Sequence, residues 1–74
     1  MQINQLDKFK LLGLNIAYFR KLKGLSQMQL AERINISRTH MSRIETAECA
    51  VSLDIVFSIC DVLDVKPSAL FDFR

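Results

Sequence analysis

The stretch from Ser26 to Glu45, SQMQLAERINISRTHMSRIE, restricts the fold more than any other part of the chain. It contains two short helix patterns with only Ile-Asn-Ile between them. Ser26, followed three residues later by Gln29, forms a capping box, which marks the start of a helix. Asn35 is of the residue type that accepts a positive φ and so suits a sharp turn, and Ser37 is a good cap for the next helix. The sequence therefore predicts two short helices joined by a tight turn, a helix-turn-helix.

Apolar residues at helical spacing fill the rest of the chain, and no strand pattern occurs. Gly24 ends the first pattern, and Pro67 suits the first position of the last helix. A chain of 74 residues makes one small domain, so we expect a single all-α domain over residues 1–74. The expected helices cover about 5–23, 26–33, 37–46, 52–63 and 67–72.

Two of these helices are expected to carry wide apolar faces. In the first, the residues expected to face the core are Phe9, Leu12, Ile16 and Phe19, widened by Leu11, Leu14, Tyr18 and Leu22. The fourth is expected to be the central buried helix, with an inward face of Leu53, Val56, Phe57, Ile59, Cys60 and Leu63. Cys60 is therefore expected to be a reduced core residue.

Several classes of protein are disfavoured by what the chain lacks. No apolar run approaches the roughly 20 residues that span a bilayer, and the N-terminus has no secretory signal, so a cytoplasmic location is the default expectation. The two cysteines, Cys49 and Cys60, are too few and too far apart for a disulfide scaffold or a zinc site. With one histidine and no glycine-rich phosphate loop, an enzyme is not expected. We expect no metal, no cofactor and no small-molecule ligand.

Charge is distributed unevenly along the chain, although the net charge is only +2. Residues 20–43 contain six basic residues and one acidic residue, whereas residues 44–74 contain six acidic residues and two basic ones. A basic pole of this kind attracts polyanions. The alternative is ordinary solvated surface charge, which the sequence alone leaves open.

The segment SRTHMSRIE, from Ser37 to Glu45, has two chemically different sides when it is drawn as a helix. Met41 and Ile44 share one side, where they are expected to turn inward and fix the helix. The opposite side is a contiguous polar stripe of Arg38, Thr39, Ser42 and Arg43. Two guanidinium groups and two hydroxyls on so short a helix favour an external partner over an ordinary solvated face.

These segments together resemble the XRE family, the phage-repressor and Cro-type helix-turn-helix regulators. The resemblance covers about residues 11–71 and rests on LSQ-x-x-LA, the turn, IS-R-x-x-x-S-R-IE and the later L-D-V, in the right order and spacing. It implies a compact five-helix, lambda-repressor-like DNA-binding domain. It also implies a sequence-specific, double-stranded DNA-binding transcription regulator, such as a repressor, whose recognition helix 37–45 enters the major groove.

The side chains on the polar stripe agree with that implication. An arginine bonds both acceptors of guanine, and the threonine methyl suits the methyl of thymine. Base contacts are therefore expected from Arg38, Thr39, Ser42 and Arg43. For Arg43, the alternative is an ion pair with an acid on the protein surface. The resemblance further implies phosphate contacts flanking the stripe, from Gln27 and Thr46. Phosphate contacts are also expected from Ser37, which is chiefly a helix cap, and from His40 at the edge of the stripe; for His40, the alternative is an exposed side chain without a role.

The resemblance also implies a partly buried ion pair between Arg20 and Glu45, which ties the first helix to the end of the third. Removal of one partner would leave an uncompensated buried charge. Glycine is common in the family where this chain carries Asn35, Ala47 and Asp64. Alanine adopts the glycine conformation less easily than asparagine or aspartate, so the loop after Thr46 is expected to take another path.

A homodimer on a (pseudo)palindromic operator is expected, because one short recognition helix contacts only about four to five base pairs. The contact between the two copies is expected from apolar residues near the C-terminus, Leu70, Phe71 and Phe73. The competing interpretation is a protein-interaction module of the antitoxin or antirepressor type, which keeps this fold and has little DNA binding.

Overall fold

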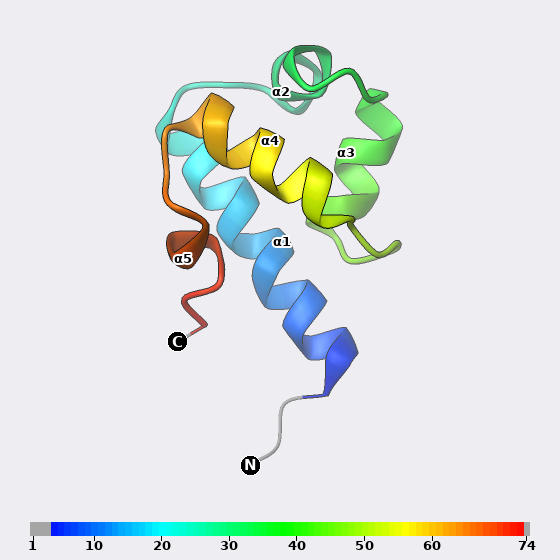
Figure 1. Cartoon of the computed structure of the whole chain (residues 1–74). Coiled ribbons are helices and arrows are strands. Elements are labelled where there is room, and N and C mark those ends of the chain that lie inside the picture. The colour runs from blue at the N-terminus through cyan, green and yellow to red at the C-terminus, as the bar shows by residue number, and fades with distance from the viewer. Residues whose placement is uncertain (1–3, 74) are drawn as a thin grey trace.

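The structure, a computed structural model, describes residues 4–73, which form five helices and no strand. The helices are α1 (Gln5–Leu22), α2 (Gln27–Arg33), α3 (Arg38–Glu45), α4 (Leu53–Leu63) and α5 (Pro67–Leu70) (Figure 1). The all-α class and the order of the helices agree with the sequence prediction. The last helix is shorter than expected, since it ends at Leu70 rather than at residue 72. No helix within residues 4–73 is long and apolar enough to cross a membrane.

Side-chain caps set the starts of the first four helices. Asn4 accepts a hydrogen bond from the Asp7 amide at 2.8 Å and so begins α1. At the start of α2 the capping box is complete: the Gln29 amide donates to Ser26 Oγ at 3.1 Å, and the Ser26 amide donates to Gln29 Oε1 at 2.8 Å. The remaining serine caps lie before α3 and α4, at Ser37 and Ser52. Local sequence therefore decides where these helices begin.

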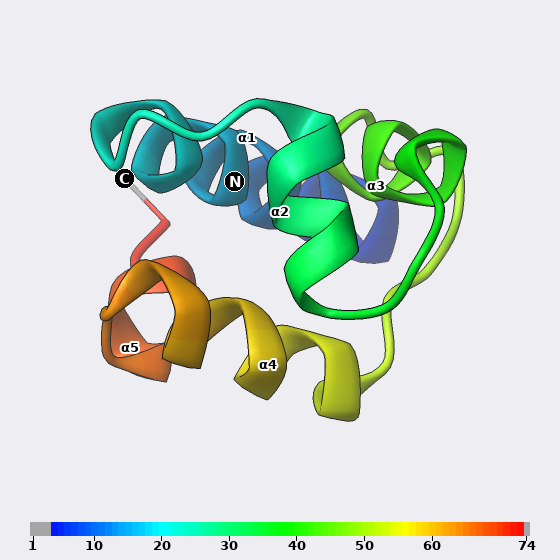
Figure 2. The same cartoon turned by 90° about the horizontal axis from the view of Figure 1, so that it is seen from above.

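The helices enclose a single core. Viewed from above, α1 lies along one side of the molecule, α4 and α5 lie along the other, and α2 stands between them (Figure 2). Each helix contributes a fully buried side chain to the centre, namely Ile16, Leu30, Met41, Ile59 and Leu70. The core is therefore built by all five helices, and α3 is held through its inner side.

The expected apolar faces of α1 and α4 are too wide. Leu14, Tyr18 and Leu22 are 63%, 59% and 69% exposed, so these three residues do not extend the buried stripe of α1. On α4, Leu53 and Phe57 are 61% and 49% exposed. The physical reason is that α1 and α4 each pack against the core through one side only, so apolar residues on the opposite side stay exposed. Periodicity identifies apolar positions but does not show which of them another element covers.

Glycine-like backbone conformations occur at the ends of three helices. Asn35, Ala47 and Asp64 have φ of 64°, 62° and 56°. After α3 the Glu48 amide donates to the Arg43 carbonyl at 2.8 Å, and the Ala47 amide donates to the Ile44 carbonyl at 3.2 Å. These two hydrogen bonds form a Schellman motif, in which the first residue after the helix cap has a left-handed backbone conformation. In this chain that residue is Ala47. The expectation that Ala47 would divert the loop is therefore wrong, because the two hydrogen bonds hold it in the left-handed region.

Gly13 permits the closest approach between α1 and α3. A Cβ atom at this position would lie 2.8 Å from the Ile44 carbonyl oxygen and closer still to that of Glu45, well inside van der Waals contact. Both obstacles are backbone atoms, which cannot rotate away. The end of α3 therefore rests directly on the backbone of α1, and this contact fixes the position of α3.

Candidate nucleic-acid interface

The structure separates the two sides of α3 as its sequence predicts. Met41 and Ile44 are 0% and 3% exposed, and they anchor the helix in the core. On the outer side Arg38, Thr39 and Arg43 are exposed, and Ser42 is half-buried. The helix lies at the edge of the molecule, next to α2 (Figure 1). The four residues expected to contact bases thus share one accessible surface.

Within residues 4–73 the two arginines of this surface have no acidic partner. The ion pair recorded in residues 4–73 joins Arg20 and Glu45, so neither Arg38 nor Arg43 is paired with a carboxylate in this part of the chain. The alternative of a surface ion pair for Arg43 therefore has no support in the structure. Two unneutralised guanidinium groups make the outer side of α3 a positively charged surface.

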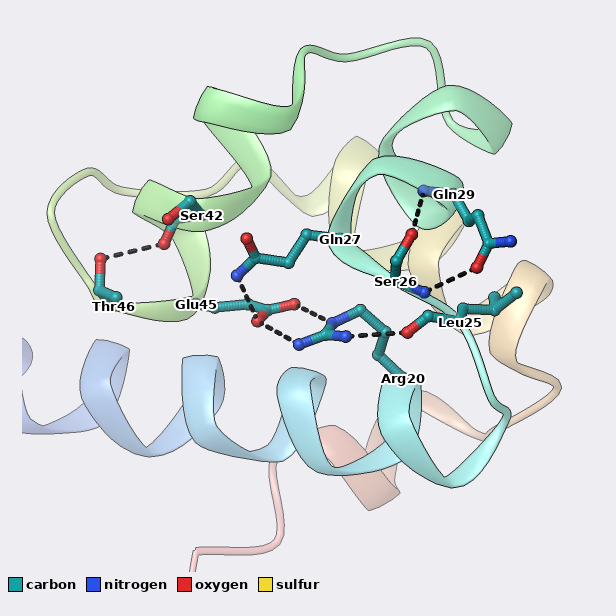
Figure 3. A network of polar contacts seen from close by, with 8 residues as sticks. All are labelled: Arg20, Leu25, Ser26, Gln27, Gln29, Ser42, Glu45 and Thr46. Atoms are coloured by element: carbon teal, nitrogen blue, oxygen red, sulfur yellow. Dashed lines mark hydrogen bonds and ion pairs between the residues drawn. The ribbon is translucent and has the colours of Figure 1, made fainter.

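A buried polar network holds the end of α3 against α1. The Arg20 guanidinium donates from Nε to Glu45 Oε2 at 2.7 Å and from Nη2 to Glu45 Oε1 at 3.0 Å (Figure 3). Its Nη1 donates to the Leu25 carbonyl at 2.8 Å. Arg20 and Glu45 are 7% and 8% exposed. The expected ion pair is thus present as a two-pronged, charge-assisted contact, the strongest geometry for an arginine and a carboxylate.

Gln27 joins the same network from α2. Its side-chain Nε2 donates to Glu45 Oε1 at 3.0 Å, so one carboxylate accepts hydrogen bonds from both α1 and α2 (Figure 3). Gln27 is half-buried, and its amide has a second hydrogen that this bond does not use. Gln27 therefore fixes the orientation of α3 relative to α2 and keeps a donor for an outside acceptor.

The other expected phosphate contacts flank the outer side of α3. Ser37 Oγ accepts from the His40 amide at 3.0 Å as a helix cap, which leaves its own hydroxyl hydrogen for another acceptor. His40 is half-buried rather than fully exposed. Thr46 is exposed at the other end of the helix, but its hydroxyl lies 3.0 Å from the Ser42 carbonyl oxygen (Figure 3). It also lies 2.7 Å from Glu48 Oε2.

The residues expected at the dimer contact lie in different environments. Leu70 is fully buried within one chain, because it completes the core from α5, so it is not available to a second copy. That part of the expectation is corrected. Phe71 is 43% exposed and Phe73 is half-buried, with their ring centroids 6.2 Å apart. These two rings border an apolar hollow that Lys8, Phe9 and Leu12 of α1 complete.

Two residues of α1 that the sequence pattern does not single out are important for packing. Asn15 Nδ2 donates to the Leu70 carbonyl at 2.9 Å and to the Asp72 carbonyl at 3.3 Å, which ties the C-terminal segment to α1. Gly13 is the site of the close approach between α1 and α3. A glycine and an asparagine inside a long helix both lower helix propensity, and this was the available signal.

Neither cysteine forms part of a metal site in the described chain. Among residues 4–73 no three side chains of the metal-binding types His, Cys, Asp and Glu gather closely enough to hold an ion. Cys60 is buried in the core, as expected, and Cys49 is half-buried. Burial, and then the charge of the neighbouring Asp61, raise the pKa of the Cys60 thiol above its ordinary value.

The fold and the surface define a helix-turn-helix protein, in which a short helix is fixed from behind and presents a basic polar side. A family model described as "Helix-turn-helix" matches residues 16–70. The chain therefore belongs to the helix-turn-helix family of XRE-type, DNA-binding transcription regulators. The structural neighbours below are a restriction-modification controller protein, a clp gene regulator and a hypothetical transcription factor.

Two curated relatives share this region. The chain is 34% identical over 56 residues to Antitoxin PezA of Streptococcus pneumoniae serotype 4, a match that covers 76% of this chain and 35% of PezA. It is 34% identical over 58 residues to the immunity repressor protein of Bacillus phage phi105, covering 78% of this chain and 40% of the repressor. The chain thus matches well under half the length of either relative.

Solved structures show the same fold. The restriction-modification controller protein C.AhdI of Aeromonas hydrophila superposes with a TM-score of 0.81 at 30% identity, over 85% of this chain and 96% of C.AhdI. The clp gene regulator ClgR of Corynebacterium glutamicum superposes with a TM-score of 0.83 at 27% identity, over 90% of this chain and 69% of ClgR. The hypothetical transcription factor NHTF from Neisseria gives a TM-score of 0.83 at 27% identity, over 96% of this chain and 82% of NHTF.

Proposed function

We propose that this protein regulates transcription by binding specific sequences in double-stranded DNA, with α3 inserted into the major groove. The observation that carries the proposal is the division of α3. Met41 and Ile44 are buried, while the arginines on the opposite side are exposed and unpaired within residues 4–73. A rigidly held helix whose free side offers charged and hydroxyl donors matches the dimensions and chemistry of the major groove.

The residues on α3 divide by the contacts that they are suited to make. Arg38 and Arg43 each provide a planar group that bonds guanine O6 and N7 together. Thr39 offers a methyl group for thymine, and Ser42, half-buried, lets the helix approach closely. A good two-pronged base contact contributes about 1–3 kcal/mol of discrimination against a wrong base. Sequence preference therefore rests chiefly on the two arginines.

Phosphate contacts on either side would set the register of α3 on the duplex. Gln27, Ser37 and His40 lie at or near the N-terminal ends of α2 and α3, and the first two each keep a hydrogen for an acceptor. Thr46 would contact a phosphate at the C-terminal end of α3. Such contacts position a protein without carrying sequence information.

We further propose that the protein acts as a homodimer on a (pseudo)palindromic operator. Two recognition helices about 34 Å apart meet successive turns of the major groove and double the length of the recognised site. The exposed ring of Phe71 and the hollow beside it form an apolar surface that a second copy would cover. We place this activity in the cytoplasm, with DNA as partner and no cofactor or small-molecule ligand required.

Selection of bound duplexes from a random DNA pool, followed by titration, tests the proposal. We expect a defined site with two related halves, and a binding constant that falls steeply with salt because phosphate contacts release counterions. A pool that yields no preferred sequence, together with no salt-dependent binding to any duplex, would refute the proposal.

The second candidate is an antitoxin-type module that binds another protein and has little affinity for DNA. Two observations favour it: the 34% identity to Antitoxin PezA, and the exposed side chains of Leu14, Tyr18 and Leu22 on α1. The same titration separates the two candidates, because a module of this kind would show no steep salt dependence with duplex DNA.

A further inference from the structure

Glu48 lies against the C-terminal end of the recognition helix and holds the Thr46 hydroxyl. Its carboxylate Oε2 accepts from Thr46 Oγ1 at 2.7 Å. The Glu48 backbone is fixed as well, because its amide donates to the Arg43 carbonyl at 2.8 Å within the cap of α3. Both Thr46 and Glu48 are exposed. A negative charge is thus placed, by backbone and side chain together, on the surface that ends α3.

The negative charge of Glu48 lies next to a positively charged surface. Arg38 and Arg43 make the outer side of α3 positive, whereas the charge of Glu48 repels a phosphate that approaches the same end of the helix. The Thr46 hydroxyl has one hydrogen. Its two close acceptors, the Glu48 carboxylate and the Ser42 carbonyl, both compete with a phosphate for that hydrogen.

We propose that Glu48 sets the DNA affinity of this protein below the value that the rest of the interface would give. It does so by repelling the DNA backbone at the end of α3 and by keeping the Thr46 hydroxyl away from phosphate. The inference rests on the proposed function, since it assumes that α3 binds DNA. Glu48 follows α3 and is not among the residues proposed to contact bases, so its effect is expected on affinity and not on sequence preference.

Removing the charge is expected to strengthen binding. For Glu48→Gln, the expected gain is about threefold to tenfold at low salt, the size of one screened interaction between a surface charge and a phosphate. The gain should be the same for the preferred duplex and for unrelated duplexes, because the phosphate backbone is common to both. It should shrink as salt is raised, since screening shortens the reach of the charge.

Asp61→Asn provides the matched control. It changes the net charge by the same amount, and Asp61 is exposed in the last turn of α4, whose C-terminal end points away from α3 (Figure 1). We expect a gain of less than about twofold for this variant, because its distance from α3 leaves only a screened long-range contribution. Equal gains for Glu48→Gln and Asp61→Asn, or no gain for Glu48→Gln, would overturn the proposal.

A double-mutant cycle tests the hydroxyl separately. Thr46→Val removes the hydroxyl and preserves the shape of the side chain. In the wild-type background it should weaken binding less than about twofold. In a Glu48→Ala background it should weaken binding about threefold or more, because the charged and nearer of the two competing acceptors is then removed and only the Ser42 carbonyl still competes with a phosphate. An equal loss of DNA affinity in both backgrounds would show that Glu48 does not keep the Thr46 hydroxyl from binding phosphate, and would contradict the proposal.

The wild-type titration keeps this test separate from that of the proposed function. If the wild-type protein binds no duplex and Glu48→Gln restores none, the proposed function fails together with the inference. If the wild-type protein binds with the expected salt dependence and the Glu48 variants bind equally well, only the inference fails. Thermal unfolding of each variant confirms that the fold is retained, since the substitutions leave the backbone bonds of the cap in place.

Discussion

The contact between Arg20 and Glu45 makes the sharpest prediction about stability. We expect Glu45→Leu to lower the free energy of unfolding by about 3–5 kcal/mol, because the Arg20 guanidinium then remains charged and buried without its partner. The structure supports a value in that range: Glu45 accepts two hydrogen bonds from Arg20 and one from Gln27, and both charged residues are less than 9% exposed. Arg20→Met should be destabilising for the same reason.

The expected loss is large compared with the stability of so small a domain. At about 0.05–0.15 kcal/mol per residue, a chain of 74 residues has a total of about 4–11 kcal/mol. The melting temperature should fall by about 12–40 °C, since 1 kcal/mol corresponds to about 4–8 °C in domains of this size. Replacing both partners by apolar residues should restore much of the loss, because no unpaired charge is then left in the core.

A double-mutant cycle measured by urea or thermal unfolding provides the assay. Wild type, Arg20→Met, Glu45→Leu and the double variant should give a coupling energy of at least about 2 kcal/mol. Lys21→Met is the matched control, since Lys21 neighbours Arg20 but is exposed, and its effect should stay within about 0.5 kcal/mol. A coupling energy below about 0.5 kcal/mol would refute the reasoning, because the two charges would then be stabilised independently.

Three further predictions concern the backbone and the buried thiol. Ala47→Gly should raise the free energy of unfolding by about 1 kcal/mol, because glycine adopts the φ of 62° without strain; a loss measured by urea unfolding would show that the cap tolerates alanine. Gly13→Ala should lower it by about 1–3 kcal/mol or more, because the new methyl group meets the backbone of α3; wild-type stability would contradict the close approach. Above about pH 9 the stability should fall, because the unfolded chain loses the Cys60 proton first while burial keeps the folded-state pKa raised. Comparison with Cys60→Ala isolates this contribution, and an unchanged slope between the two proteins at alkaline pH would exclude it.

Features that depend on neighbouring residues in the sequence were predictable. Ser26 and Gln29 predict the start of α2, and Asn35 predicts the turn, because capping and left-handed conformations depend on residues only a few positions apart. The division of α3 into a buried and an exposed side followed from the spacing of Met41 and Ile44. The Arg20–Glu45 contact was reached through the family resemblance, since nothing local links residues 25 positions apart.

Features that depend on tertiary packing were not predictable from the pattern. Leu14 and Phe57 fit the apolar spacing of α1 and α4, yet no other helix covers them. Leu70 is expected at a dimer contact because it lies near the C-terminus, but in the structure it is fully buried in the core of its own chain. At Ala47 the intrinsic preference of alanine disfavours a left-handed backbone, but the two backbone hydrogen bonds of the cap outweigh that preference, and neither is visible in the sequence.

The affinity of Arg38→Ala for the selected duplex, and for a full set of its single-base variants, shows whether the outer side of α3 recognises bases. We expect the variant to lose about 1–3 kcal/mol on the selected duplex and to lose its preference at one position in each half-site, with preference elsewhere unchanged. Equal weakening on every duplex, with all preferences intact, would contradict base recognition by α3, because Arg38 would then contact only phosphate.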